Sequence, residues 1–164
     1  MVILAGWSDH YESPEKSDNY TGKPFEHMAE TQNKILETLG SSLRISDDAT
    51  YDDQYNGGQN YRLYFNCYGS NFLTQGIVVD KDNLFSDYYT QQFSHYGGAS
   101  IYAVDGSGNP AATLPATVSP VVFGHAGTYS VDADEDGMEN GLGGGDSVPK
   151  YKTPEGDNRL MIMA

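Results

Sequence analysis

The sequence has few of the features that cross-link a chain or hold it in a membrane. Cys67 is the only cysteine among 164 residues, so no disulfide can form within the chain. No stretch approaches the roughly 20 apolar residues that a membrane span requires. The beginning of the chain has an apolar run of only four residues and no basic leader, so we expect no secretory signal peptide. These absences predict a protein that is made in the cytoplasm and binds no membrane.

Basic residues are also scarce. The chain has 9 Lys and Arg residues against 23 Asp and Glu residues, which gives a net charge of −14 and a pI near 4.3. A surface this negative repels phosphate groups, so the composition argues against binding to nucleic acid or to anionic membranes. The charge suits a soluble exposed protein, a cation binder or a protein that works in salty water.

The sequence shows no recognisable set of catalytic residues. Its four histidines are scattered, without the spacing of zinc ligands. Neither Ser70 nor Ser100 lies in the G-x-S-x-G pattern of a nucleophilic serine. Cys67 falls on the apolar side of a predicted strand, where cysteine usually acts as an inert small hydrophobe. We therefore expect that the protein is not an enzyme.

One motif has a chemical mechanism attached to it, the acidic run 132–140. Asp132, Asp134 and Asp136 occupy loop positions 1, 3 and 5, Gly137 follows at position 6, and Asn140 stands at position 9. This spacing directs several oxygen atoms at one hard cation and places glycine at the sharp bend. We predict that these three carboxylates and the Asn140 carboxamide bind Ca²⁺ weakly. The alternative is an acidic surface turn.

The run resembles the D-x-D-x-D-G loops of EF-hand and thrombospondin type 3 proteins. The resemblance covers about a dozen residues and implies a calcium site, not an overall fold. It departs from both families at position 12, where Gly143 replaces a carboxylate. A strand pattern at 129–131 precedes the loop, whereas an EF-hand would have a helix there. The missing ligand implies an affinity of roughly 10⁻⁴–10⁻³ M.

Apolar periodicity predicts one helix and several strands. Pro24, apolar residues at offsets of 3, 4 and 7, and Gly40 indicate an amphipathic helix over 24–39 whose core side includes Ile35 and Leu36. Alternation over 61–68 predicts a half-buried strand with Leu63 and Phe65 inside. Segment 84–98 fits a helix or a loop, and prolines make 111–120 an edge strand or a segment outside the sheet. Further strands are predicted at 73–79, 100–104, 121–123 and 128–131, with a turn at 105–110.

These elements predict an α+β, mainly β fold. An extended arm (1–23) would precede a single domain (24–146) with the helix and an antiparallel sheet or sandwich with long loops. A tail (147–164) would follow the domain. The arm contains Trp7, and the tail ends on Leu160, Met161, Ile162 and Met163. Apolar residues in such segments gain order by docking on another surface. We therefore expect Trp7 and residues 160–163 to contact neighbouring chains.

The general character of the chain is similar to that of small virion proteins of tailed bacteriophages. It is acidic, free of disulfides and rich in Gly, Tyr and Asn. The resemblance implies a structural subunit of the virion, either a capsid decoration or a tail-associated protein, made in the host cytoplasm. Its partners would be further copies of itself or other virion proteins. The alternative is a calcium-dependent glycan-binding or adhesion module that uses the 132–146 loop and a surface rich in the 13 tyrosines.

Overall fold

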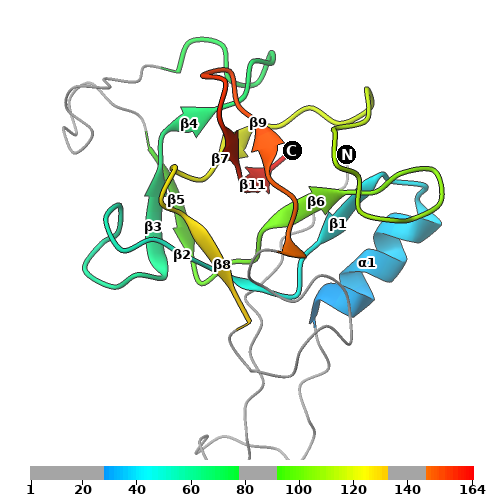
Figure 1. Ribbon diagram of the computed structural model, residues 1–164, viewed down its shortest axis with the longest axis horizontal. Coiled ribbons are helices and arrows are strands. Elements are labelled where there is room, and N and C mark those ends of the chain that lie inside the picture. Colours follow the sequence, from blue (N-terminus) through cyan, green and yellow to red (C-terminus); the bar gives the residue numbers. More distant parts are fainter. Residues whose placement is uncertain (1–27, 78–91, 133–146) are drawn as a thin grey trace, which may run out of the picture.

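The computed structural model describes residues 28–77, 92–132 and 147–164 (Figure 1). Within these ranges the chain forms one helix, α1 (Met28–Thr38), and short strands that all pair antiparallel. The prediction of a mainly β fold with one helix and antiparallel sheets is therefore confirmed. No helix in the described ranges has the length and the apolar character that a membrane crossing needs.

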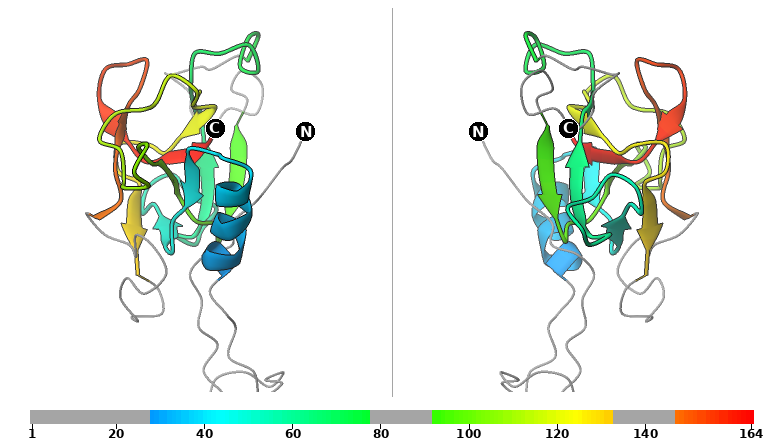
Figure 2. Two further views of the ribbon diagram at one scale, coloured as in Figure 1. Left: turned by 90° about the vertical axis from the view of Figure 1, so that its right-hand side faces the viewer. Right: turned by 90° about the vertical axis from the view of Figure 1, so that its left-hand side faces the viewer.

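The strands form one larger sheet and three two-stranded pairs in the described part of the chain. The five-stranded sheet has the order β1-β6-β11-β7-β4, and the pairs are β9-β10, β2-β8 and β3-β5. The strand bounds are β1 Leu43–Ile45, β2 Ala49–Tyr51, β3 Arg62–Phe65, β4 Cys67–Tyr68, β5 Phe93–Tyr96, β6 Ile101–Ala103, β7 Val122–Phe123, β8 Tyr129–Val131, β9 Tyr151–Lys152, β10 Asn158–Arg159 and β11 Met161–Met163. Figure 2 shows α1 on one side of the molecule and the β9-β10 pair on the other.

The alternation predicted over 61–68 is confirmed within β3 (Arg62–Phe65). A single strand over 61–68 is wrong, because the buried Asn66 separates β3 from β4, which belongs to the five-stranded sheet. Leu63, Phe65 and Cys67 are buried, whereas Arg62 and Tyr64 on β3 are exposed. Successive side chains of a strand point to opposite faces, so one apolar face buried against the core is enough to specify this segment. The strands predicted near 100–104 and 128–131 are present as β6 and β8. The prediction of a helix or a loop over 84–98 is wrong for Phe93–Tyr96, which forms β5 because it pairs with β3.

The last described strand, β11, lies between β6 and β7 in the five-stranded sheet. Leu160, Met161 and Ile162 are at most 7% exposed and belong to the two main core clusters. The prediction that these three residues contact neighbouring chains is therefore wrong, and residues 147–164 are part of the domain and not a tail. The reason is a turn at Gly156 (φ +100°) that sends the chain back into the sheet. Of the predicted contact residues in this segment, Met163 remains partly exposed.

Helix α1 packs on the sheet through a polar residue as well as apolar ones. The Asn33 side chain donates to Ile45 O (2.9 Å) and accepts from Ile45 N (2.8 Å). Asn33 thereby supplies hydrogen-bond partners to the N–H and C=O groups on the outer edge of β1, as a neighbouring strand would. Because Asn33 takes this inward position, Ile35 and Leu39 are turned outward, 44% and 58% exposed. The predicted core side of the helix is thus wrong for Ile35, while Leu36 packs partly against the core. Residues 24–27 lie outside the described ranges.

Three further predicted segments have different outcomes. The turn at 105–110 is confirmed, since the Asp105 carboxylate accepts from Ser107 N (2.8 Å) and Asn109 N (3.0 Å). The strand predicted at 73–79 is wrong over 73–77, which forms turns, and residues 78–79 are not described. Segment 111–120 contains no strand and lies outside the sheet, while β7 is an interior strand.

Tyr151 closes a gap in the hydrogen bonding of the five-stranded sheet. Strand β11 pairs with β6 only at Ile101, and the Ala103 N–H, two residues on, instead donates to the buried Tyr151 hydroxyl (2.9 Å). Replacing Tyr151 with Phe leaves this N–H without its acceptor, so we expect a loss of about 1–3 kcal/mol in the free energy of unfolding. Urea denaturation measures the loss. Tyr96→Phe, at an exposed position, is the control and should change stability by less than about 0.5 kcal/mol. Equal effects of the two variants would contradict this role.

Candidate functional site

The predicted calcium ligands lie almost entirely outside the described residues. Asp132 directly follows β8 and is partly buried, whereas Asp134, Asp136 and Asn140 fall in the undescribed range, as does Trp7. Calcium binding by this loop therefore stays a prediction. Across 28–77, 92–132 and 147–164, no group of three or more His, Cys, Asp or Glu side chains is placed to hold a metal ion.

The structure assembles a buried carboxylate site that sequence patterns did not indicate. Asp48 is fully buried, and its carboxylate accepts from Ser100 N (2.8 Å), Ser100 Oγ (2.7 Å) and Ser130 Oγ (2.5 Å). Burial raises the pKa of Asp48, and the hydrogen bonds from Ser130 and Ser100 oppose that shift. The site joins the turn before β2 to the start of β6 and to β8. This arrangement connects three segments of the chain and serves stability.

A second buried carboxylate, Asp52, organises the loop that leads to β3. Its Oδ1 accepts from Gln54 N (2.9 Å) and Tyr55 N (2.8 Å), and its Oδ2 accepts from the Thr128 hydroxyl (2.8 Å). All three hydrogen-bond donors are backbone or hydroxyl groups of this same chain. Asp52 therefore shapes the 52–60 loop and ties it to the turn before β8.

Of the two described histidines, His125 is buried and His95 is partly buried. His125 stacks on Tyr55 with ring centroids 4.0 Å apart, and its Nε2 lies 3.0 Å from Tyr64 O. Desolvation by burial lowers the pKa of both His95 and His125. Cys67 is buried in the main apolar cluster. These side chains pack in the region between β3, β5 and β7.

The surface feature that stands out is the turn of residues 70–77, which we call the apolar turn. It carries Phe72 and Leu73, which are 77% and 60% exposed, and Phe72 is more exposed than any other large hydrophobic side chain of the described ranges. The turn follows β4, the edge strand of the five-stranded sheet. It protrudes at the top of the molecule in Figures 1 and 2. Two adjacent apolar side chains exposed to this extent make the turn a candidate interaction site.

Hydrogen bonds hold the apolar turn in one shape. The Asn71 side chain donates to Pro120 O (2.5 Å) and accepts from Leu73 N (2.9 Å). The Thr74 hydroxyl lies 2.5 Å from Gly69 O and accepts from Asn71 N (3.2 Å). Asn and Thr side chains stabilise tight turns by such local bonds. Phe72 and Leu73 are therefore presented on a braced support.

Glycine at position 69 allows the close approach of the turn to the neighbouring chain segment. A Cβ atom at Gly69 would lie 1.9 Å from Pro120 O, closer than any real contact. Gly69 N also donates to Val121 O (3.0 Å). Any side chain at this position would force the turn away from residues 120–121.

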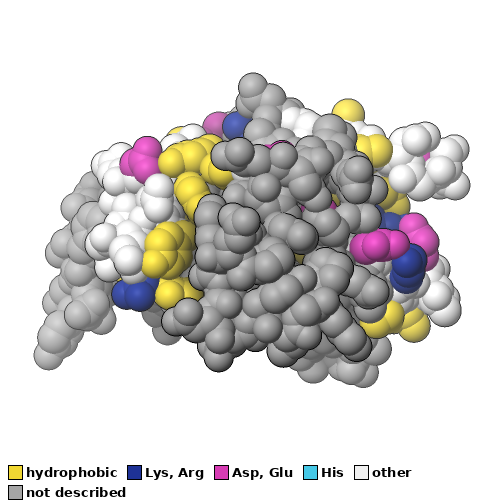
Figure 3. All heavy atoms as spheres, turned by 90° about the horizontal axis from the view of Figure 1, so that it is seen from below, with side chains coloured by type: hydrophobic (Ala, Val, Ile, Leu, Met, Phe, Trp, Pro, Cys, Tyr) yellow, Lys and Arg dark blue, Asp and Glu magenta, His cyan; other side chains and the backbone are white. Residues whose placement is uncertain are grey.

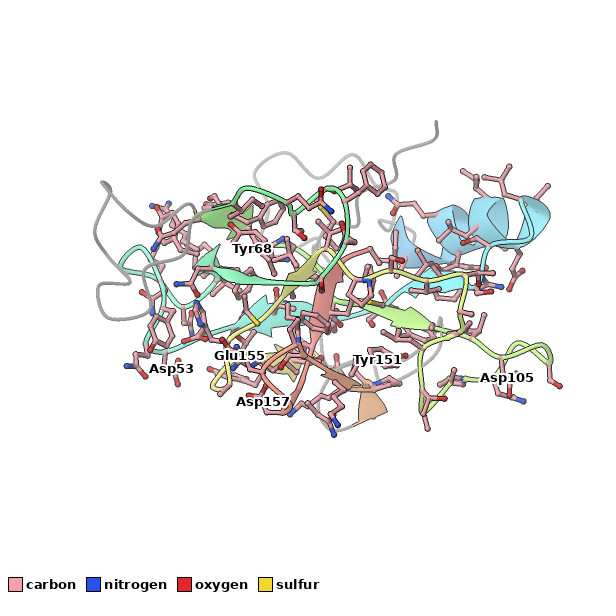
Figure 4. The ribbon with its side chains drawn as sticks, turned by 90° about the horizontal axis from the view of Figure 1, so that it is seen from above. Asp53, Tyr68, Asp105, Tyr151, Glu155 and Asp157 are labelled. Carbon is pink, nitrogen blue, oxygen red and sulfur yellow. The ribbon has the colours of Figure 1, made fainter. Side chains whose placement is uncertain are left out.

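A shallow groove of about 450 Å³ lies beside the turn, and none of its lining residues is charged. The lining residues are Tyr68, Gly69, Ser70, Asn71, Phe72, Thr74, Gln75 and Pro154. The nearest acidic residues along the chain from Pro154 are Glu155 and Asp157, both labelled in Figure 4 with Tyr68. Arg159 pairs with both, at 2.8 Å each. The groove is thus an uncharged area on a strongly acidic protein.

A separate surface on β3, β5 and the β2-β8 pair carries tyrosines; we call it the tyrosine surface. Tyr61 and Tyr96 meet edge to face, 5.6 Å between ring centroids, and the Arg62 guanidinium lies 5.1 Å from the Tyr96 ring centroid. Tyr129 donates to the exposed carboxylate of Asp53 (3.0 Å). Figure 3, a view from below, shows hydrophobic side chains gathered on the left, where β2, β3 and β5 lie in Figure 1.

Sequence patterns missed both the apolar turn and the Asp48 site. The apolar residues around Leu73 favoured a strand, although Asn71 and Gly76 on either side are turn residues. Comparison with protein-family models, with curated proteins and with solved structures found no match to this chain.

Proposed function

We propose that this protein is a non-enzymatic structural subunit of a larger assembly, most simply a phage virion, as a capsid decoration or tail-associated protein. The observation that carries the proposal is the exposure of Phe72 and Leu73 on the braced apolar turn. The function of the protein is then to bind other chains, and the turn is the contact.

The energetics favour the apolar turn as an anchor. Burying one such apolar side chain gains about 1.5–3 kcal/mol. Association also has a cost, because side chains and loops lose freedom at an interface, and a turn that is already held in one shape loses less. Aromatic side chains at a well-packed contact frequently contribute much of the binding energy of an interface. Phe72, which lines the groove beside the turn, fits this role.

The second candidate function is a glycan-binding or adhesion module, for which the tyrosine surface is the supporting observation. Tyr96 is 61% exposed and packs edge to face against Tyr61. Tyrosine offers a large contact area at a small entropic cost. This candidate places binding on β3 and β5, at a different part of the surface from the apolar turn, so variants at the two places distinguish the two functions.

The assembly proposal predicts that polar residues on the apolar turn prevent attachment to the particle. In the phage that encodes the chain, Phe72→Ser/Leu73→Ser should reduce the amount of this protein on gradient-purified particles at least about 30-fold, the equivalent of a loss of 2 kcal/mol. Quantitative immunoblotting of the particle fraction measures the change.

The chain provides a matched control in Leu39→Ser, because Leu39 is 58% exposed directly after α1 and Leu73 is 60% exposed on the turn. The Leu39 variant should attach normally. Loss of attachment in Tyr96→Ala, with the turn variant still attached, would favour the tyrosine surface instead. Absence of the wild-type chain from purified particles would refute the assembly proposal.

A further inference from the structure

We propose that the partner on the apolar turn is a second copy of this chain, held in a two-fold symmetric contact in which Leu73 of each copy enters the groove of the other. This inference rests on the proposed function, because it identifies the partner at the same contact. It adds the identity of the partner, the symmetry and the side chain that is inserted.

The distribution of charge favours a partner that is itself acidic. The protein has a net charge of −14, so two copies repel each other over most relative orientations. Residues 63–77 contain no Asp, Glu, Lys or Arg, and the same is true of 106–131, which include Pro120 beside the turn. A basic partner would gain most by docking on the acidic surface. An uncharged patch is where a second acidic chain docks with least repulsion.

The two acidic residues that follow Pro154 in the sequence share one basic partner, Arg159. Arg159 Nη2 lies 2.8 Å from Glu155 Oε2, and Arg159 Nε lies 2.8 Å from Asp157 Oδ2. Arg159 offsets one of the two negative charges next to Pro154, so the turn between β9 and β10 opposes the contact less than two unpaired carboxylates would.

The patch is also self-complementary. A two-fold contact uses the same surface on both copies, so the inserted side chain and its receiving groove must lie next to each other. Leu73 is exposed and does not line the groove, whereas Phe72, Tyr68 and Pro154 do. The groove volume of about 450 Å³ falls within the range of roughly 300–1,000 Å³ found for pockets that hold small ligands. One copy thus supplies both parts of the contact.

The small size of the patch predicts weak association in dilute solution. Contacts that bury less than about 1,200 Å² in total are usually transient. In a particle, further contacts hold neighbouring copies close together, and the effective concentration strengthens each weak contact. The two-fold contact is therefore expected to be detectable at high concentration in solution.

Cysteine cross-linking tests the symmetry. In a two-fold contact, a residue of the turn lies close to the same turn of the other copy, so Gln75→Cys forms a disulfide with itself. Gln75 lines the groove and is exposed, and its replacement leaves Phe72 and Leu73 in place. The native Cys67 is buried and does not interfere. Leu39→Cys, at an exposed position directly after α1, is the control for random collision.

We expect the purified full-length Gln75→Cys variant to form disulfide dimers at least about tenfold faster than Leu39→Cys under the same oxidant. The additional changes Phe72→Ser/Leu73→Ser should reduce the rate to that of the control. Wild-type protein should show a concentration-dependent shift toward dimer in sedimentation velocity. Equal cross-linking rates, or a wild-type monomer at every concentration, would overturn the two-fold contact. Attachment of the wild-type chain to particles in that case would leave the assembly proposal intact, with another chain as the partner.

Discussion

Deletion of residues 158–164 should abolish folding. These residues include β11, the middle strand of the five-stranded sheet, and the buried side chains Leu160, Met161 and Ile162. Truncating even one such side chain to alanine costs about 2–5 kcal/mol, and a whole domain is stable by only about 5–15 kcal/mol. The loss of three core side chains together with the pairing to β6 and β7 exceeds that margin.

Circular dichroism and amide-proton NMR dispersion of the purified deletion variant measure the outcome. We expect a chain without a cooperative unfolding transition, recovered mainly in the insoluble fraction. Removal of the exposed Ala164 alone is the control and should leave the unfolding transition unchanged. A deletion variant that remains soluble and unfolds cooperatively would show that residues 158–164 are dispensable for the core.

The second large effect concerns Asp48. Replacing it with Ala removes the acceptor for the buried Ser100 N–H and for two hydroxyls, so we expect a loss of about 2–4 kcal/mol in the free energy of unfolding. Asp48→Asn retains an acceptor for the N–H and should cost less. Asp53→Ala is the control, because Asp53 is also an aspartate but is exposed. It should change stability by less than about 0.5 kcal/mol. Urea denaturation at neutral pH measures all three.

The pH dependence of these variants follows from the raised pKa of Asp48. The folded protein binds this proton more tightly than the unfolded chain, whose carboxyl has a pKa near 3.8. The stabilising contribution of the protonated carboxyl is therefore complete below about pH 3.8 and is lost as the pH rises through the folded-state pKa. Asp48→Asn lacks this titration, so its stability relative to the wild type should improve between about pH 3.8 and neutral pH. A constant difference across that window would contradict a raised pKa.

Local patterns were sufficient for the elements whose burial is decided locally. Strand β3 alternates in and out because only one of its faces meets the core, and the turn at Asp105 closes through its own carboxylate. The helix was predictable over Met28–Thr38 but not in its orientation. Asn33 faces inward because it bonds to Ile45 across twelve residues, and no apolar periodicity contains that information.

Distant contacts account for the remaining errors. The apolar run 160–163 had to be buried, but the sequence does not indicate whether its own sheet or a neighbouring chain provides the surface. Its place between β6 and β7 is decided by packing against segments far along the chain. Similarly, Asp48 meets Ser100 and Ser130, which are 52 and 82 residues away. Leu73 fits the start of a strand in the sequence because an apolar side chain in a sequence does not reveal its exposure.

The central position of β11 also determines how the nascent protein must behave during translation. Strand β6 leaves the ribosome roughly 60 residues before β11, which at about 5–20 residues per second corresponds to roughly 3–12 s. During that interval the edges of β6 and β7 that later receive β11 lack their partner, and open strand edges favour pairing with the wrong chain. The sheet therefore closes only after residues 161–163 have emerged. Chaperone demand and aggregation during synthesis should depend on how quickly this strand is made.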